Sequence, residues 1–152
     1  MACRVRAIVA VCDDWGIGID GHMLVSNRED MRHFVAQTVG HAVVMGRRTL
    51  DDRRNVVLTR DPGFSREGVE VAHDLDEALR MVADEDEAWV IGGGQVYREA
   101  LSRCEDAVVT HNHCTLPADA RFPDLGREPG WRLERTWGAS QTPEGVAFEF
   151  AR

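Results

Sequence analysis

Three consecutive glycines join a strand-like run to a helix-like run in the segment VIGGGQVY, residues 90–97. Glycines that lead straight into a helix leave backbone amides free at its N-terminus, where the helix dipole favours negative charge. This segment therefore indicates a phosphate site at Gly92, Gly93 and Gly94, where the helix begins. The alternative is a tight strand-to-helix turn with no ligand, because the glycines do not follow the GxGxxG spacing of a dinucleotide-binding fingerprint.

Two more strand ends carry residues that bind anions. One places small and donor residues after an apolar run, and these are Gly46, Arg47, Arg48 and Thr49. The other places Thr59 and Arg60 after the run NVVL. Arg binds phosphate through two parallel hydrogen bonds, so Arg47 and Arg60 from neighbouring strand ends could hold one further phosphate. Either Arg alone is better explained as a solvated surface residue, but three such junctions in an acidic protein favour a polyanionic ligand.

Asp30 is the side chain best placed to handle a proton. It lies one residue before Met31 and four before Phe34, so on a helix it shares the margin of an apolar face. A carboxylate held against apolar walls has a raised pKa, which suits proton transfer near neutral pH. The alternative is a first-turn acid that favours the helix dipole, as we expect for Glu29.

The composition of the 152 residues fits one globular domain over residues 1–152. There are 18 basic residues, all of them Arg, against 26 acidic ones. A net charge of −8 argues against non-specific nucleic-acid binding, and any polyanion site must concentrate its Arg locally. No apolar run approaches the ~20 residues of a membrane span, and no long heptad pattern indicates an oligomer. We therefore expect a cytoplasmic monomer that binds small molecules.

Neither cysteine nor histidine shows the spacing of a metal site. The four cysteines, Cys3, Cys12, Cys104 and Cys114, form no C-x-x-C pair, so free thiols in a reducing compartment are expected. The six histidines are scattered, and His111 and His113 are better explained as surface polar residues than as ligands. No metal is predicted.

Strand-like and helix-like segments alternate along the chain, which is typical of an α/β fold with a largely parallel sheet. The expected strands span residues 4–12, 41–46, 54–59, 68–72, 88–92 and 107–113. The expected helices span residues 27–38, 75–83 and 95–102, with a brief helical turn from Arg47. Residues 131–137 and 145–150 should close the sheet as an antiparallel hairpin. Ligands of such folds bind at the carboxyl ends of strands, where the three anion-binding junctions fall.

The first expected helix has a start signal and an apolar face. Ser26 and Glu29 form the Ser-x-x-Glu pattern of a capping box. The residues that recur at helical spacing, and so form the expected apolar face, are Met31, Phe34, Val35 and Thr38.

Taken in order, these segments resemble the dihydrofolate reductase family. The resemblance rests on WGIGIDGHM, EDMRHFVAQT, VVMGRRT, RNVVLT, VIGGGQVY and VTHNH followed by DARFPD, which are spread over residues 5–124. It implies an eight-stranded, mostly parallel sheet in a three-layer α/β fold, with about four helices and a C-terminal antiparallel hairpin. It also implies hydride transfer from NADPH to 7,8-dihydrofolate, which yields tetrahydrofolate.

The resemblance further implies roles on the substrate side. Asp30 matches the acid that hydrogen-bonds the pterin and supports its protonation, and Thr110 matches the hydroxyl that fixes this acid. The residues that match the walls of the pterin site are Val9, Met31, Phe34 and Ile91. Arg53 matches the Arg that binds the glutamate carboxylate of the substrate.

On the cofactor side, the resemblance places Ile17 and Met23 in the loop that closes over the nicotinamide. The phosphate-binding turn is matched by Gly46, Arg47, Arg48 and Thr49, and the glycine junction by Gly93, Gly94, Gln95 and Val96. Thr59 and Arg60 match the pocket for the 2′-phosphate, which implies a preference for NADPH over NADH.

The sequence departs from the family pattern in two places. Leu24-Val25 stand where the family usually has Pro-Trp, which affects the loop that closes the site. Only three residues separate Thr49 from Arg53, so a wall of the benzoyl-glutamate groove is shortened and Arg54 could replace Arg53. Two other hypotheses therefore stay open. One is a reductase of the same fold that acts on a pterin or pyrimidine without this tail, and the other is a catalytically weak NADPH-binding protein.

Overall fold

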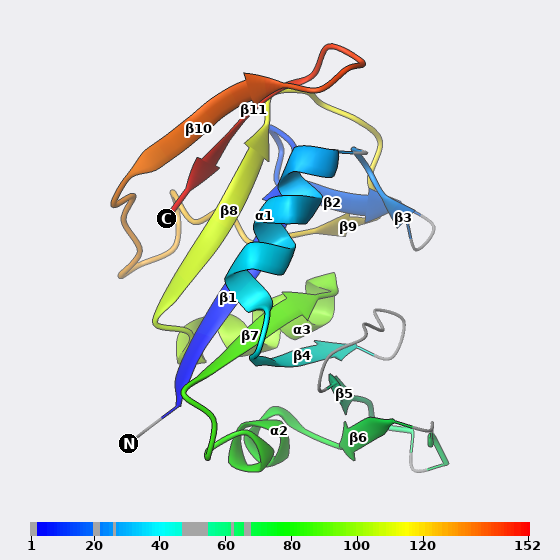
Figure 1. The fold of residues 1–152 in the computed structure, drawn as a ribbon. Helices are drawn as coiled ribbons and strands as arrows, with labels where there is room; N and C mark the ends of the chain where they lie inside the picture. The colour runs from blue at the N-terminus through cyan, green and yellow to red at the C-terminus, as the bar shows by residue number, and fades with distance from the viewer. Residues whose placement is uncertain (1–2, 20–21, 26, 47–54, 62, 66–67) are drawn as a thin grey trace.

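The computed structural model describes residues 3–19, 22–25, 27–46, 55–61, 63–65 and 68–152. Its large sheet has eight strands in the order β10-β11-β8-β1-β7-β4-β5-β6 (Figure 1). These strands are β1 (Arg4–Val11), β4 (Ala42–Gly46), β5 (Asn55–Leu58), β6 (Val69–Ala72), β7 (Glu87–Gly92), β8 (Asp106–Asn112), β10 (Thr136–Gln141) and β11 (Ala147–Ala151). The expected mostly parallel eight-stranded sheet is confirmed.

Pairing within the sheet is parallel from β8 to β6 and antiparallel at the C-terminal end. β1 lies in the middle and pairs in parallel with β7 and β8. The hairpin of β10 and β11 adds two antiparallel pairs beyond β8. The carboxyl ends of the parallel strands therefore meet at one edge of the sheet, which is where ligands of such folds bind.

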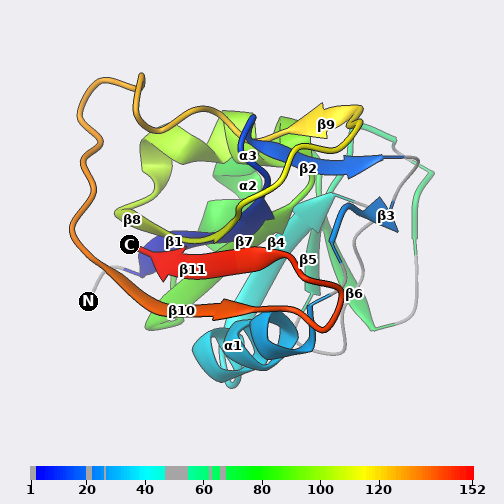
Figure 2. The same cartoon turned by 90° about the horizontal axis from the view of Figure 1, so that it is seen from above.

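Helices cover the two faces of the sheet unequally. The helix α1 (Arg28–Thr38) lies on one face, while α2 (Leu75–Met81) and α3 (Gly94–Ala100) lie on the other (Figure 2). Alternate residues of the buried strands supply the two cores: Val44 and Val90 face α2 and α3, whereas Val43 and Trp89 belong to the cluster on the α1 side. About four helices were expected. The described residues contain three, followed by one 3-10 turn (Leu101–Arg103), and none of these helices could cross a membrane.

A second, smaller sheet forms beside the first and was not predicted. It consists of β2 (Gly16–Ile19), β3 (His22–Met23) and β9 (Ala120–Arg121) in the order β3-β2-β9. The strands have two to four residues, too few for a periodic signal, and β9 comes from a distant part of the chain. This sheet fixes the segment after β1 across the carboxyl edge of the large sheet.

The start of α1 differs from the prediction. Its N-cap is Asn27, whose side chain accepts a hydrogen bond from the backbone N of Asp30 at 3.0 Å. The predicted capping box with Ser26 is therefore wrong, since Asn27 is one residue closer to the helix. Ser26 itself lies outside the described residues.

The expected apolar face of α1 is only half correct. Thr38 is buried and Phe34 is partly buried, but Met31 and Val35 are exposed. Met31 lies at the rim of a cleft, which explains why it is not covered by the sheet.

The closing hairpin begins later than expected. Strand β10 starts at Thr136 instead of residue 131, and β11 ends at Ala151. Leu133 is exposed, so the alternation that suggested a strand over residues 131–137 does not reflect a buried face. The chain before Thr136 instead follows the C-terminus, where the backbone N of Glu134 donates to the carbonyl of Arg152 at 2.8 Å.

Candidate functional site

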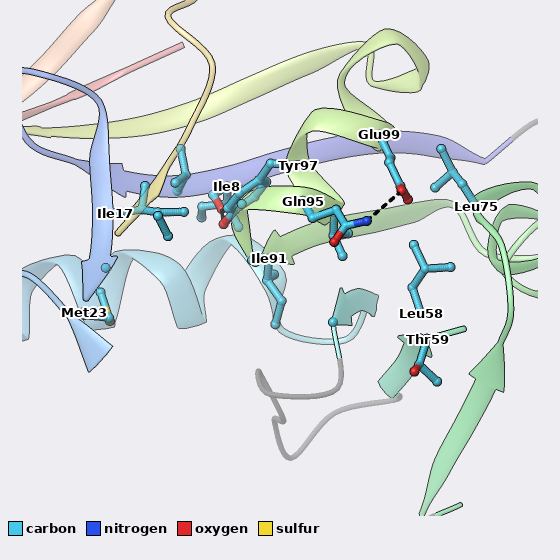
Figure 3. A pocket seen from close by; sticks show the side chains of 18 of the residues that line it. Ile8, Ile17, Met23, Leu58, Thr59, Leu75, Ile91, Gln95, Tyr97 and Glu99 are labelled. Carbon is cyan, nitrogen blue, oxygen red and sulfur yellow. Dashed lines mark hydrogen bonds between the residues drawn. The ribbon is translucent and has the colours of Figure 1, made fainter. Parts of the chain in front are cut away.

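A cleft of about 1600 Å³ runs along the carboxyl edge of the large sheet. It extends from the β2–β3 segment, with Ile17 and Met23, past Ile91 at the end of β7, to Leu58 and Thr59 at the end of β5 (Figure 3). Sites for drug-sized ligands usually measure about 300–1000 Å³, so this cleft is large enough for more than one small molecule.

Asp30 lies at the inner wall of the cleft, on the first turn of α1. It is only 8% exposed, and the Thr110 hydroxyl on β8 donates a hydrogen bond to its Oδ1. Burial raises the pKa of the Asp30 carboxyl, and the hydrogen bond from Thr110 opposes this rise by stabilising the charged form. The two residues are eighty positions apart in the chain, and the structure brings them together as the resemblance implied.

Apolar side chains line the same cleft as this carboxyl. The residues expected to wall a flat ring, namely Val9, Met31, Phe34 and Ile91, all line the cleft. Ile17 and Met23 line it from the β2–β3 segment (Figure 3). The arrangement places one titratable carboxyl in a largely apolar part of the cleft.

Tyr97 is a cleft residue that sequence reasoning missed. Its hydroxyl donates to the backbone carbonyl of Ile8 at 2.7 Å. Burial raises the pKa of the Tyr97 phenol, and the negative charge of Asp30 raises it further. A neutral tyrosine at this position closes the floor of the cleft. The only signal in the sequence was its position on the α3 turn after the glycines.

The glycine junction lies in the middle of the cleft. Gly93 is the N-cap of α3, and the backbone N of Tyr97 donates to its carbonyl at 3.0 Å. A Cβ added to Gly93 would meet no atom within 4 Å, so the backbone here borders open space. Gly46 at the end of β4 packs against this turn, with Val96 Cγ2 at 3.6 Å from its ideal Cβ position. Gly94, Gln95 and Val96 also line the cleft, so the junction presents bare backbone that fits a phosphate-bearing group.

The far end of the cleft is polar. Thr59 and Arg60 follow β5 there, as expected, and the Arg60 guanidinium Nη2 lies 3.8 Å from Glu99 Oε1. Gln95 Nε2 donates to the same Glu99 oxygen at 3.4 Å (Figure 3). Glu99 and His73 were not predicted as cleft residues. His73 Nδ1 is 3.2 Å from the Thr59 carbonyl oxygen, which links the ends of β5 and β6.

Four predicted site residues, Arg47, Arg48, Thr49 and Arg53, lie outside the described residues, as does the shortened segment between them. The two histidines of β8 and its end are described. His111 packs edge-on against Trp15, with ring centroids 5.3 Å apart. His113 lies 3.8 Å from Asp13 and 3.6 Å from Glu149, a carboxylate neighbour that the sequence did not suggest. Among the described residues, no group of three or more His, Cys, Asp or Glu side chains could hold a metal ion.

The fold and the cleft together define a class of α/β proteins with a large, partly apolar cleft along the carboxyl edge of a mostly parallel sheet, where ligands of such folds bind. The family model described as dihydrofolate reductase matches residues 4–152. The chain therefore belongs to the dihydrofolate reductase family.

Individual relatives agree with this assignment. The chain is 45% identical to the type 3 dihydrofolate reductase of Salmonella typhimurium, over 96% of this chain and 94% of that one. It is 31% identical to the dihydrofolate reductase of Neisseria gonorrhoeae, over 97% and 95%. The dihydrofolate reductase of Mycobacterium tuberculosis is 43% identical over 71% of this chain and 76% of its own.

A solved structure supports the fold. The dihydrofolate reductase of Enterococcus faecalis, described as complexed with NADP(H) and RAB-propyl, superposes with a TM-score of 0.88. The match covers 99% of this chain and 96% of that one at 24% identity, so it is evidence for the shared architecture alone.

Proposed function

We propose that the protein catalyses the NADPH-dependent reduction of 7,8-dihydrofolate to 5,6,7,8-tetrahydrofolate. The observation that carries the proposal is the buried Asp30 carboxyl, held by Thr110 in the apolar part of a cleft that also contains the glycine junction. Membership of the dihydrofolate reductase family supports the same reaction.

Asp30 and Thr110 are the proposed catalytic residues. NADPH, when bound, supplies the hydride. The Asp30 carboxylate is placed to accept hydrogen bonds from the pterin amino group and ring nitrogen, and burial raises its pKa, which makes it a better proton acceptor than an exposed carboxylate. Thr110 donates to Oδ1 of Asp30, and in this scheme the other oxygen would bind the substrate.

The apolar walls have a separate role in this scheme. Val9, Met31, Phe34 and Ile91 would flank the pterin and exclude water from the reacting atoms. Exclusion of water strengthens the electrostatic interactions of Asp30 with the ring. Ile17 and Met23 would cover the nicotinamide from the β2–β3 segment.

The rest of the cleft is proposed to bind the cofactor. Bare backbone at Gly93, which borders open space, would allow close approach of the pyrophosphate, with Gly46, Gly94, Gln95 and Val96 lining the cleft around it. Thr59 and Arg60 would bind the 2′-phosphate, which favours NADPH over NADH. Arg47, Arg48 and Thr49 are assigned to the phosphates from the sequence alone.

The site for the benzoyl-glutamate tail of the substrate has weaker support than the pterin and cofactor sites. Arg53, or Arg54 beside it, is proposed to bind the glutamate carboxylate. Only three residues stand between Thr49 and Arg53, and this favours a second candidate function: reduction of a dihydropterin without the benzoyl-glutamate tail.

The negative charge of −8 and the absence of a heptad pattern support a monomer without nucleic-acid partners, and we place it in the cytoplasm.

The test is NADPH oxidation followed by absorbance, with dihydrofolate as substrate. Asp30→Asn should lower kcat at neutral pH by about 10²–10⁴-fold, the usual contribution of a positioned acid. Glu29→Gln is the matched control, because Glu29 is an exposed acid in the same helical turn and does not line the cleft. Equal activity of the wild type and Asp30→Asn would contradict the proposal.

The same assay separates the two substrates. For the proposed function, kcat/KM for dihydrofolate should exceed kcat/KM for a tail-less dihydropterin, because the tail adds binding energy. A higher kcat/KM for the tail-less compound would favour the second candidate function. NADPH binding without turnover of either compound would leave a cofactor-binding protein and exclude both.

A further inference from the structure

Two cysteines that the proposed reaction does not use lie side by side at the base of the β2–β3 segment. Cys12 directly follows β1 and Cys114 lies two residues after β8, so 102 positions separate them in the chain. Their Sγ atoms are 3.5 Å apart. Cys12 is 2% exposed, whereas Cys114 is partly exposed and so reachable from solvent.

Backbone hydrogen bonds fix the positions of both residues. The backbone N of Cys12 donates to the carbonyl of Gly16 at 2.9 Å, and the backbone N of Asp13 donates to the carbonyl of Cys114 at 2.9 Å. The second bond joins the two segments directly beside the sulfur atoms. Because an S–S bond is about 2.05 Å long, bond formation requires the two sulfur atoms to approach by only about 1.5 Å.

We propose that Cys12 and Cys114 are a redox modification site, which a small-molecule disulfide converts reversibly into an intramolecular disulfide. The existence of this bond does not depend on the proposed function. Its consequence for the cleft, argued below, rests on the proposal that the cleft binds NADPH.

The chemistry proceeds by two thiol–disulfide exchanges. Cys114 loses its proton to solvent, and its thiolate attacks one sulfur of the small disulfide, which forms a mixed disulfide and releases one small thiol. Cys12 then loses its proton, and its sulfur attacks Cys114 Sγ and displaces the second small thiol. Two protein thiols are oxidised to one disulfide, and the small disulfide is reduced to two thiols.

The order of the two steps follows from the surroundings. Cys114 reacts first because it is the more accessible of the two. Burial, together with the neighbouring Cys114 thiol, raises the pKa of Cys12 to about 12, so Cys12 is a poor partner for an external reagent. Its proximity to Cys114 makes the second exchange an intramolecular step.

The disulfide would close a ring that includes one wall of the cleft. From Cys12 and Cys114 the two segments leave the large sheet together and pair again where β2 meets β9. The backbone N of Asp119 donates to the Gly18 carbonyl at 3.0 Å, and that of Phe122 to the Trp15 carbonyl at 2.9 Å. A covalent bond at the base of this ring restricts movement of the wall that carries Ile17, and with it the exchange of cofactor.

The first experiment tests the bond itself. The reduced full chain is incubated with oxidised glutathione, then its free thiols are titrated and its intact mass and peptide map are determined. We expect two of the four thiols to disappear, with the mass lower by two hydrogen atoms and one cross-linked peptide pair that contains Cys12 and Cys114. Cys114→Ser should abolish the cross-link, and Cys12→Ser should stop at a glutathione adduct on Cys114. Cys104→Ser, the matched control, should cross-link as the wild type does.

The second experiment tests the consequence. NADPH dissociation is followed by fluorescence for the reduced and the oxidised protein. Oxidation should slow dissociation by about threefold or more, as expected if opening of this wall limits release, and a dithiol should restore the original rate. Loss of thiols that persists in Cys114→Ser, or a stable glutathione adduct in the wild type, overturns the proposed site. If the disulfide forms but the rate of NADPH dissociation is unchanged, the proposed effect of the disulfide on the cleft is overturned. Failure of the reduced protein to bind NADPH overturns the proposed function and leaves the thiol results unaffected.

Discussion

Glu99 gives a prediction that follows from the charges at the polar end of the cleft. Its Oε1 lies 3.8 Å from the Arg60 guanidinium and accepts a hydrogen bond from Gln95. In the proposed function Arg60 binds the 2′-phosphate of NADPH, so Glu99 competes with the cofactor for the same cation. Glu99→Gln keeps a hydrogen-bonding side chain of the same size and removes only the charge.

The size of the effect follows from the geometry. Two unit charges 3.8 Å apart attract by about 1 kcal/mol in a medium with the dielectric constant of water. The Arg60 side chain is 86% exposed, and exposed pairs of this kind contribute about 0.2–1 kcal/mol when measured. Loss of this competition should therefore tighten NADPH binding by about 1.4- to fivefold, with no comparable change for NADH.

The assay is fluorescence titration of both cofactors at low and at high salt. About 1 M salt reduces the screening length to about 3 Å, so the gain should largely disappear there. Arg60→Gln supplies the control, because Glu99→Gln should have no effect in a chain that already lacks the Arg60 charge. A gain of equal size for NADH, or a gain that persists in Arg60→Gln, would refute the reasoning.

Two further predictions concern stability. Burial raises the pKa of Asp30 in the folded state above its pKa in the unfolded state. At a pH above both pKa values the buried charge lowers the free energy of unfolding. At a pH below both values Asp30 is protonated in both states, so this destabilisation is absent. Asp30→Asn should therefore increase the free energy of unfolding at neutral pH and change it little near about pH 3, as denaturant titrations at both pH values would show. An equal change at both pH values would contradict this. Gly138→Ala should cost about 2 kcal/mol or more, because the residue has φ +70° and a Cβ there would lie 2.6 Å from Phe150 Cδ2. Gly40 has φ +79° and open space around it, so Gly40→Ala should lower the stability only through the unfavourable backbone conformation. If thermal denaturation shows the same loss of stability for both variants, the clash with Phe150 is excluded.

The large sheet was predictable because its central strands are buried on both faces. Parallel strands in this position form continuous apolar runs, and β1, β4 and β7 all follow this rule. The small sheet was not predictable, since strands of two to four residues carry no periodic signal and their partners are distant in the chain. The start of β10 was missed for a related reason: Leu133 alternates with polar residues but is exposed.

The candidate site divides in the same way. Local chemistry in the sequence indicated the glycine junction, because strand, glycines and helix are contiguous. The pairing of Asp30 with Thr110 could be anticipated only from the family resemblance, since it depends on α1 lying against β8. Nothing local distinguished Glu99 from the other acids. Glu99 lies one helical turn after Gln95, so both side chains face the cleft. This spacing could be interpreted only once the start of α3 was known.

The helix that carries Asp30 is attached to the sheet by few apolar contacts. Met31 and Val35 are 49% and 44% exposed, and Val39, the C-cap, is 61% exposed. The aromatic contacts of the helix are Phe34, partly buried against the core, and His33, stacked on Phe150 with ring centroids 4.1 Å apart. Segments with so little buried apolar surface open locally at a smaller free-energy cost than the whole fold. Amide hydrogens of α1 are therefore expected to exchange with solvent before those of β1 and β7. The Asp30 carboxyl is thus expected to belong to a subglobal unfolding unit, and the proposed activity would be lost on heating while most of the sheet is still intact.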